Sequence, residues 1–267
     1  MKRITTLISS VMVIAFTASC GTVNRPVAVS SDINYSELDG TGSGWGFVKK
    51  EGEAPDMPLR ITETFEKYGG CWIDKSGAKS LYLTFDEGYE NGFTAVILDI
   101  LHKTGTPAAF FVTGPYLEGQ GELIKRMIAE GHVVGNHTVR HLNLPKQSVE
   151  TVKTEITELN DRCEELYSYK MEYMRPPEGE SSERTLAVTQ GLGMKTIMWS
   201  LAYKDWDVNI QKGADYAYRS VMPYLHDGAI ILLHAVSSDN TYALEKIITD
   251  ARAQGYEFRS LDELPLN

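Results

Sequence analysis

Ionisable residues stand at five places where short apolar runs of the chain give way to polar segments. These places are Asp86-Glu87, His137 with His141, Arg175, Asp205-Trp206 and His234. The set contains a base, an acid, orienting charges and ligands for a metal ion, which are the groups that hydrolysis of an amide requires. We therefore expect the five places to form one catalytic site.

Each place also has an ordinary structural explanation. The carboxylates of the first place could belong to a turn, since Asp and Gly favour turns. His137 and His141 are four residues apart and could bind one metal ion from one face of a helical turn, although most such pairs bind nothing. Arg175 could be a surface cation, and His234 could be a buried core residue. The joint occurrence of all five favours the catalytic explanation.

Seven short apolar runs read as strands, with helix-period segments between them. The runs are Leu81–Phe85, Ala108–Val112, Val133–Asn136, Tyr173–Arg175, Lys195–Trp199, Ala229–Leu233 and Glu257–Arg259. This alternation predicts a parallel sheet that is covered on both faces. We predict an α/β fold, a deformed (β/α) barrel of about seven parallel strands, with an open doubly wound sheet as the alternative. In a barrel, the five polar places lie together at the carboxyl ends of the strands.

Apolar residues at helical spacing predict three of the intervening helices. The stripes extend over residues 93–101, 149–166 and 244–251, and Gly105 and Gly255 are suitable ends for the first and the third.

The chain has 267 residues and ordinary globular proportions, with 42 % hydrophobic and 23 % charged residues. Lys and Arg number 26 against 36 Asp and Glu, so the formal net charge is −10. Because no Lys/Arg-rich run is present, we expect no nucleic-acid partner and no binding to an anionic membrane surface through charge.

The first residues resemble an export signal. Lys2 and Arg3 precede a mostly apolar run over residues 4–18, which is short for a membrane span. Small residues before Cys20 resemble a bacterial lipobox, with Thr17 at a position that is usually aliphatic. We expect a signal peptide over residues 1–19 and a lipid anchor at Cys20 on the outer face of the cytoplasmic membrane. A plain secretory signal and a retained anchor are the alternatives.

The rest of the chain divides by composition. Residues 20–50 are rich in Gly, Ser and Thr and read as a flexible tether, and residues 51–79 read as an N-terminal extension with a short helix near residues 61–68. Residues 80–264 form the predicted catalytic domain. Cys71 and Cys163 could form a disulfide, although Cys163 lies on an apolar stripe and also suits a small buried position.

Five motifs resemble those of the polysaccharide deacetylase family (NodB homology domain, carbohydrate esterase family 4), in the order usual for that family. They are Thr84-Phe85-Asp86-Glu87-Gly88, His137-Thr138-Val139-Arg140-His141, Arg175-Pro176-Pro177-Glu178-Gly179, Asp205-Trp206 and Leu232-Leu233-His234. Within the family, segments 85–92, 212–218 and 234–240 are most similar to the delta-lactam-biosynthetic de-N-acetylases of endospore-forming bacteria, which act on muramic acid in peptidoglycan.

The resemblance implies a role for each catalytic residue. Asp86 would be the general base that deprotonates a metal-polarised water, and Arg175 would pair with it and keep it ionised. His234 would be the general acid that protonates the departing amine, with Asp205 holding it charged and oriented.

The resemblance also implies a metal site and a substrate pocket. His137 and His141 would bind a divalent metal ion, for which zinc suits the donors best, with Glu87 where the family usually has an Asp ligand. This longer side chain could still reach the ion or could point away from it. The main-chain N–H of Glu178 would stabilise the oxyanion. Trp206 and Leu232 would wall a pocket for the acetyl methyl group.

The implied function is removal of acetyl from N-acetylmuramic acid in peptidoglycan, leading to muramic delta-lactam in spore cortex. Arg140 or Lys204 could meet the lactyl carboxylate of that sugar. One alternative is a deacetylase for N-acetylglucosamine in peptidoglycan or for chitooligosaccharides. An alternative of another class is a glycan-binding domain without catalysis. Ala202, which replaces a usual Asp of the fourth motif, weakens a supporting contact only.

Overall fold

The computed structural model describes residues 33–265. The predicted signal peptide, the predicted lipidation site Cys20 and the first part of the predicted tether lie outside this range.

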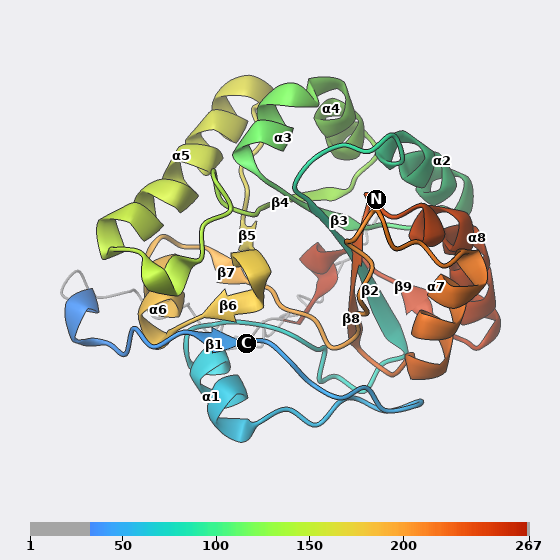
Figure 1. Ribbon diagram of the computed structural model, residues 1–267, viewed down its shortest axis with the longest axis horizontal. Helices are drawn as coiled ribbons and strands as arrows, with labels where there is room; N and C mark the ends of the chain where they lie inside the picture. Colours follow the sequence, from blue (N-terminus) through green and yellow to red (C-terminus); the bar gives the residue numbers. More distant parts are fainter. Residues whose placement is uncertain (1–32, 266–267) are drawn as a thin grey trace, which may run out of the picture. The chain divides into compact units, whose positions relative to one another are not determined.

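Seven strands form a parallel sheet in the order β7-β5-β4-β3-β2-β8, and β9 also pairs with β2 (Figure 1). They are β2 (Ser80–Glu87), β3 (Ala109–Val112), β4 (Val133–Asn136), β5 (Tyr173–Met174), β7 (Lys195–Thr196), β8 (Ala229–His234) and β9 (Glu257–Phe258). Every residue of β2 is buried, as expected for a strand that is covered on both faces. All seven predicted strands are confirmed at these positions.

The sheet curls into a half-barrel, and its two ends are joined by single bridges. Leu201 forms a parallel bridge with Ile231 of β8, and Cys71 forms one with Ile197, just after β7. Ile73 forms an antiparallel bridge with Ala229. The prediction of a deformed parallel barrel is therefore confirmed in the form of a half-barrel.

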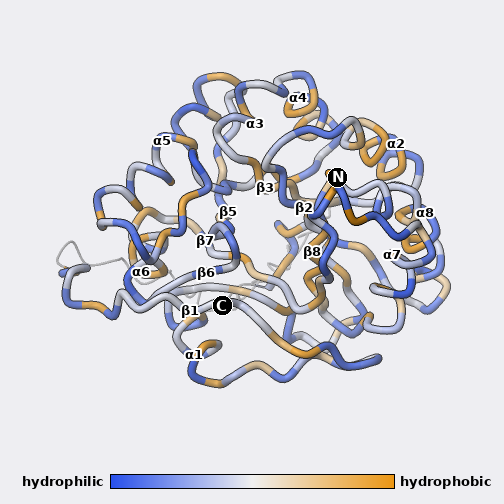
Figure 2. Tube along the Cα trace, viewed as in Figure 1, coloured by the Kyte–Doolittle hydropathy of each residue, from blue (hydrophilic) through white to orange (hydrophobic). Residues whose placement is uncertain are grey.

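Helices cover the outer face of this sheet (Figure 1). The predicted stripes correspond to α2 (Thr94–Thr104), α5 (Val149–Tyr167) and α8 (Ser238–Ala253), and the other helices are α1 (Leu59–Lys67), α3 (Gly114–Gly119), α4 (Gly121–Ala129), α6 (Glu183–Gly191) and α7 (Ala214–Val221). Single 3-10 turns are η1 (Tyr35–Glu37), η2 (Leu144–Lys146), η3 (Pro177–Gly179), η4 (Met222–Tyr224) and η5 (Leu261–Glu263). Along α2 and α8, hydrophobic and hydrophilic stretches alternate (Figure 2), which gives each helix one face for the core.

The alternation of side chains along β2 determines what faces the inside of the half-barrel. Leu83 and Phe85 join the core between the sheet and the helices, whereas Tyr82 joins a separate cluster with Phe111 and Ile230. Since successive side chains of a strand point to opposite faces, Asp86 follows Tyr82 to the inside and Glu87 follows Phe85 toward the helices.

Residues 43–50 form a strap along the half-barrel, and the prediction of a flexible tether up to residue 50 is wrong for them. The strap begins with β1 (Ser43–Gly44), which pairs antiparallel with β6 (Glu180–Ser181). The next residue, Trp45, is buried, and its indole N–H donates to the carbonyl of Trp199 at 2.8 Å. Burial of an aromatic side chain and pairing of the main chain stabilise this segment against the loss of conformational entropy.

Two further expectations concern the cysteines and the membrane. Cys71 and Cys163 are both free, so the disulfide considered from the sequence is absent between these two described residues. Cys163 packs in the core on α5, as its apolar stripe suggested. Within residues 33–265, no helix is both long and apolar enough to cross a bilayer.

Candidate active site

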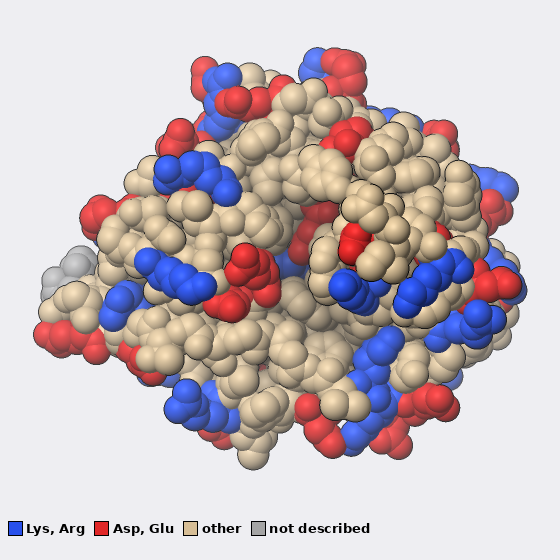
Figure 3. All heavy atoms as spheres, in the orientation of Figure 1, with Lys and Arg blue, Asp and Glu red and all other residues tan. Residues whose placement is uncertain are grey.

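A cavity of about 940 Å³ opens at the carboxyl ends of the strands. Figure 3 shows a hollow in this face of the molecule, with acidic and basic side chains at its floor. The predicted site residues that line the cavity are Asp86, His137, His141, Glu178, Trp206, Leu232 and His234. The structure thus brings most of the sequence-predicted residues to one place.

Strand register places Asp86 and His234 beside each other. They are partners at the ends of the neighbouring parallel strands β2 and β8. Since parallel strands carry equivalent positions to the same edge of the sheet, the two side chains enter the cavity from adjacent points.

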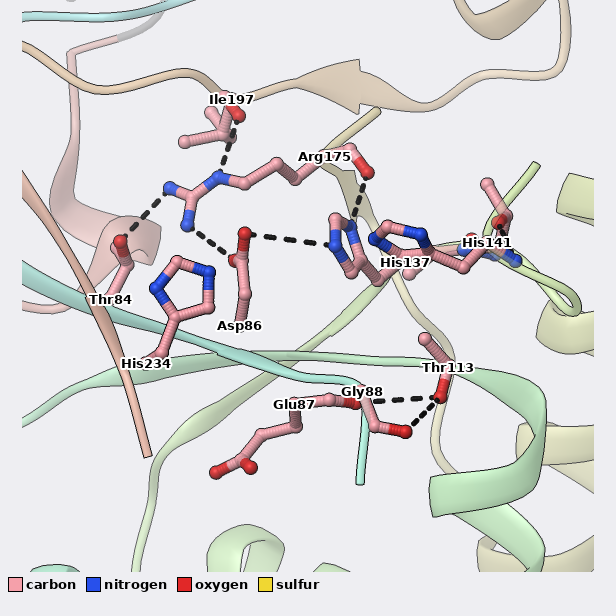
Figure 4. Close-up of polar contacts among 12 residues, drawn as sticks. Thr84, Asp86, Glu87, Gly88, Thr113, His137, His141, Arg175, Ile197 and His234 are labelled. Atoms are coloured by element: carbon pink, nitrogen blue, oxygen red, sulfur yellow. Dashed lines mark hydrogen bonds and ion pairs between the residues drawn. The ribbon is translucent and has the colours of Figure 1, made fainter. Parts of the chain in front are cut away.

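Arg175 lies directly after β5 and is completely buried. Its guanidinium donates to Oδ1 of Asp86 at 2.8 Å, to the hydroxyl of Thr84 at 2.9 Å and to the carbonyl of Ile197 at 3.1 Å (Figure 4). Burial alone would raise the pKa of Asp86, but the charges of Arg175 and the nearby histidines outweigh it, so that this pKa lies below its usual value. Asp86 is therefore ionised and able to accept a proton.

Asp205 binds His234 twice. Its Oδ1 accepts from Nδ1 of the ring at 2.7 Å, and its Oδ2 accepts from the main-chain N–H at 2.9 Å. Burial opposes the charged ring, but the hydrogen bond and the charge of Asp205 outweigh this, so that the pKa of His234 is raised. A raised pKa keeps the imidazolium available as a proton donor near neutral pH.

His137 and His141 lie on the loop after β4, with ring centroids 4.8 Å apart. Nδ1 of His137 lies 2.8 Å from the carbonyl of Arg175, and because a carbonyl only accepts, this nitrogen carries the proton. Nε2 then holds the lone pair and lies 3.7 Å from Oδ2 of Asp86. Burial lowers the pKa of His137 to about 4 although Asp86 opposes the shift, so the ring is neutral, as a metal ligand must be.

Glu87 does not join the two histidines, and the ligand set predicted from the sequence is not assembled. Figure 4 shows its carboxylate directed away from both imidazole rings. It is fully buried and accepts a hydrogen bond from Thr94 of α2 at 3.4 Å. The physical reason is the strand alternation of β2, which sends Asp86 to the cavity and its neighbour to the helix side. Burial, reinforced by Glu90, raises the pKa of Glu87 well above its usual value.

The remaining donors fit a metal ion held by two protein ligands. Two imidazoles, one with its tautomer fixed for binding through Nε2, are borderline-soft donors that suit zinc and similar divalent ions. Among residues 33–265, no group of three His, Cys, Asp or Glu side chains is arranged to hold a metal ion.

The predicted substrate-binding residues lie around the same cavity. Trp206 is 53 % exposed, and its ring centroid lies 5.9 Å from that of His234. Leu232 lines the cavity and lies two residues before His234 on β8. Glu178 has a positive φ of 60°, and its carboxylate accepts from Asn143 at 2.9 Å.

Sequence reasoning missed the strap as part of the site. Trp45, Phe47 and Lys49 line the cavity. The strap spans it, because Trp45 N–H donates to the carbonyl of Gly179 at 2.9 Å and the ammonium of Lys49 donates to the carbonyl of Ser220 at 2.8 Å. The sequence did contain a sign of this role, because Trp45 and Phe47 stand in a glycine-rich segment. A flexible linker has no need of aromatic residues.

Known proteins are similar to this chain in fold and in sequence. The family model described as polysaccharide deacetylase matches residues 74–197. The peptidoglycan-N-acetylmuramic acid deacetylase PdaA of Bacillus subtilis is 42 % identical over 222 residues, which cover 82 % of this chain and 84 % of the relative. An uncharacterized 30.6 kDa protein of Geobacillus stearothermophilus is 46 % identical over the same length and the same shares of both chains.

A solved structure agrees with these relatives. Bacillus subtilis PdaA, a family 4 carbohydrate esterase, matches with a TM-score of 0.82 at 40 % identity, covering 85 % of this chain and 98 % of that chain. The chain therefore belongs to the polysaccharide deacetylase family, carbohydrate esterase family 4. It is a hydrolase of amide bonds.

Proposed function

We propose that this protein removes the acetyl group from N-acetylmuramic acid residues of peptidoglycan. The observation that carries the proposal is the pair of Asp86 and His234, which lie side by side in one cavity and are held by Arg175 and Asp205 respectively. The chain that carries this pair is 42 % identical to a muramic acid deacetylase. The freed amine and the lactyl carboxyl of the same sugar can then condense, with loss of water, to the muramic delta-lactam of spore cortex.

In the proposed reaction, Asp86 and His234 move the protons. Asp86 takes a proton from the attacking water, whose oxygen bonds to the acetyl carbon. Arg175 keeps this carboxylate ionised and fixed in place. As the C–N bond breaks, His234 gives its proton to the amine nitrogen, and Asp205 stabilises the imidazolium before this transfer. The products are acetate and the free amino sugar.

The cavity wall supplies the other roles. Trp206 and Leu232 enclose the acetyl methyl group, and the main chain at Glu178 donates to the developing oxyanion. His137 and His141 would hold a divalent ion, which we propose to be zinc. Such an ion acts as a Lewis acid on oxygen when bound. With two protein ligands in place of three, we expect weak metal affinity.

The substrate places the enzyme outside the cytoplasmic membrane, because peptidoglycan lies there. The sequence 1–19 would direct export, and Cys20 would carry the lipid anchor. Both remain proposals on residues outside the described range.

The test compares two glycans at equal concentration. One is a peptide-free peptidoglycan strand, in which the lactyl carboxylate is free, and the other is a chitin oligomer, which lacks the lactyl group. A site that pairs this carboxylate loses several kcal/mol when it is missing, so acetate release from the first should be much faster. Mass spectrometry of the glycan fragments identifies the sugar that has lost its acetyl group.

Two outcomes contradict the proposal. Comparable rates on both glycans, or a preference for the chitin oligomer, favour a glucosamine deacetylase. Binding of either glycan without acetate release favours a glycan-binding domain without catalysis.

A further inference from the structure

The carboxylate of Asp205 has a third donor that the catalytic motifs do not include. Besides its two hydrogen bonds to His234, its Oδ2 accepts from the side-chain amide of Asn240 at 2.5 Å. Asn240 is 1 % exposed and Asp205 is 4 % exposed, so bulk water does not compete for this contact. Hydrogen bonds to a buried charge are among the stronger ones in proteins.

The partners of Asn240 fix the orientation of its amide. The nitrogen Nδ2 faces Oδ2 of Asp205 and, at 3.2 Å, the main-chain carbonyl of His234, and both of these atoms only accept. The oxygen Oδ1 accepts from the hydroxyl of Tyr203. Burial and the nearby acidic residues raise the pKa of Tyr203, so this hydroxyl keeps its proton. The chain of bonds therefore extends in one direction, from Tyr203 through Asn240 to Asp205.

The backbone also holds this chain of hydrogen bonds in place. Asn240 lies in the first turn of α8, and its N–H donates to the hydroxyl of Ser237, the residue that caps the helix. The loop that carries Asp205 reaches the same turn through Gln211, whose side-chain oxygen accepts from the hydroxyl of Ser237 at 2.9 Å and from the N–H of Asp239 at 3.2 Å. Helix and loop thus hold Asn240 and Asp205 at a fixed separation.

We propose that Asn240 and Tyr203 are positioning residues for the general acid, because they hold the Asp205 carboxylate in the one orientation that serves His234. The inference rests on the proposed role of His234. Without the amide of Asn240, the carboxylate keeps only its contacts to His234 and can rotate about its broad terminal torsion. The imidazolium of His234 then loses its fixed partner. We expect this to slow the step in which the amine nitrogen takes a proton.

The experiment separates this step from the rest of catalysis by the choice of substrate. An amide needs a proton on its leaving nitrogen, whereas 4-nitrophenyl acetate releases a phenolate that is stable without one. Asn240→Ala should lower kcat for acetate release from peptide-free peptidoglycan strands by about 10- to 100-fold, with KM nearly unchanged. Its rate on the ester should stay within about 2-fold of the wild type. Tyr203→Phe should show the same selectivity with a smaller loss.

Two reference variants give the comparison its meaning. His234→Ala should show the same selective loss more strongly, because it removes the general acid itself. Tyr218→Phe is the matched control, since its hydroxyl donates to Asp250 at 2.6 Å on α8 but does not line the cavity. It should leave both rates unchanged.

Equal losses on amide and ester would show that Asn240 only supports the shape of the site, and they would overturn the inference. Unchanged amide turnover in Asn240→Ala would overturn it as well. If the wild type prefers a chitin oligomer, the proposed substrate is wrong, and the same amide-to-ester comparison on that oligomer still tests the positioning role.

Discussion

Arg175 binds His137 through its main chain and Asp86 through its side chain. Its carbonyl accepts the Nδ1 proton of His137 at 2.8 Å, and its guanidinium donates to Oδ1 of Asp86 at 2.8 Å (Figure 4). One residue therefore sets the tautomer of a proposed metal ligand and the ionisation of the proposed base. The rigid Pro176 that follows it restricts its backbone to an extended conformation and so helps to hold both contacts.

Replacing the base tests the centre of this arrangement. Asp86→Asn keeps the size of the side chain but removes the proton acceptor, so acetate release should fall by about 10²-fold or more. The measurement is the kcat for acetate from peptide-free peptidoglycan strands. Turnover near that of the wild type would contradict the assignment of Asp86.

The buried ion pair should also be visible in stability. Arg175→Met leaves the carboxylate of Asp86 buried without a partner and should lower the free energy of unfolding by about 3–5 kcal/mol. Adding Asp86→Asn removes the stranded charge and should recover part of that loss. Urea denaturation of the wild type and of both variants measures this. A double variant less stable than Arg175→Met alone would count against the explanation.

The pH profile follows from the two shifted groups. Asp86 must be ionised and its pKa is lowered, whereas His234 must be protonated and its pKa is raised, so kcat/KM should be bell-shaped with a broad plateau. Asp205→Asn removes the negative charge that stabilises the imidazolium. The pKa of His234 should then fall, and the alkaline limb of the profile should move to lower pH. Asp207→Asn, on the same loop, is the control and should leave the limb in place.

Metal content tests the histidine pair. The double variant His137→Ala/His141→Ala should lose the bound divalent ion, because it removes both imidazole donors. Elemental analysis of the purified proteins measures this, with His102→Ala as a control on an exposed histidine. Equal metal content in the wild type and the double variant would contradict the proposed site.

Glu87 gives the sharper comparison. Its carboxylate faces α2, so Glu87→Asp should not raise metal content although it restores the usual family residue. Glu87→Gln should make the protein more stable at neutral pH. A carboxyl whose pKa is raised on folding costs stability once the pH exceeds its unfolded value, and the amide carries no such cost. Tighter metal binding in Glu87→Asp would show that the side chain reaches the ion.

The sequence was sufficient for the sheet because burial on both faces leaves continuous apolar runs, as in 229–233. It was also sufficient for the site, since parallel strands bring Asp86, His137 and His234 to one edge. Glu87 was assigned from its motif position, whereas the period of two along β2 decides its direction. The alternation applies to Glu87 only if β2 extends that far. The end of a strand is uncertain by about one or two residues, so the sequence did not decide the direction of this side chain.

The strap could not be predicted for a different reason. Its strand β1 has two residues and pairs with β6, more than 130 residues further along the chain. No local sequence pattern predicts a pairing between strands that are so short and so far apart. The glycines of the strap, considered alone, indicate flexibility. Asn240 lay in a segment noted for its similarity to related enzymes, but only the structure shows that its amide reaches Asp205.

Because of the strap, the part of the chain that forms the cavity is longer than the part that the family model matches. The family match begins at residue 74, yet Trp45, Phe47 and Lys49 form part of the catalytic cavity. An expression fragment cut at the family boundary would lose a wall of the cavity. It would also lose Trp45, Phe65 and Trp72, and so expose Leu186, Ala187 and Met198, which share a buried cluster with them. The smallest active fragment should therefore begin before Ser43, about 30 residues earlier than the start of the family match.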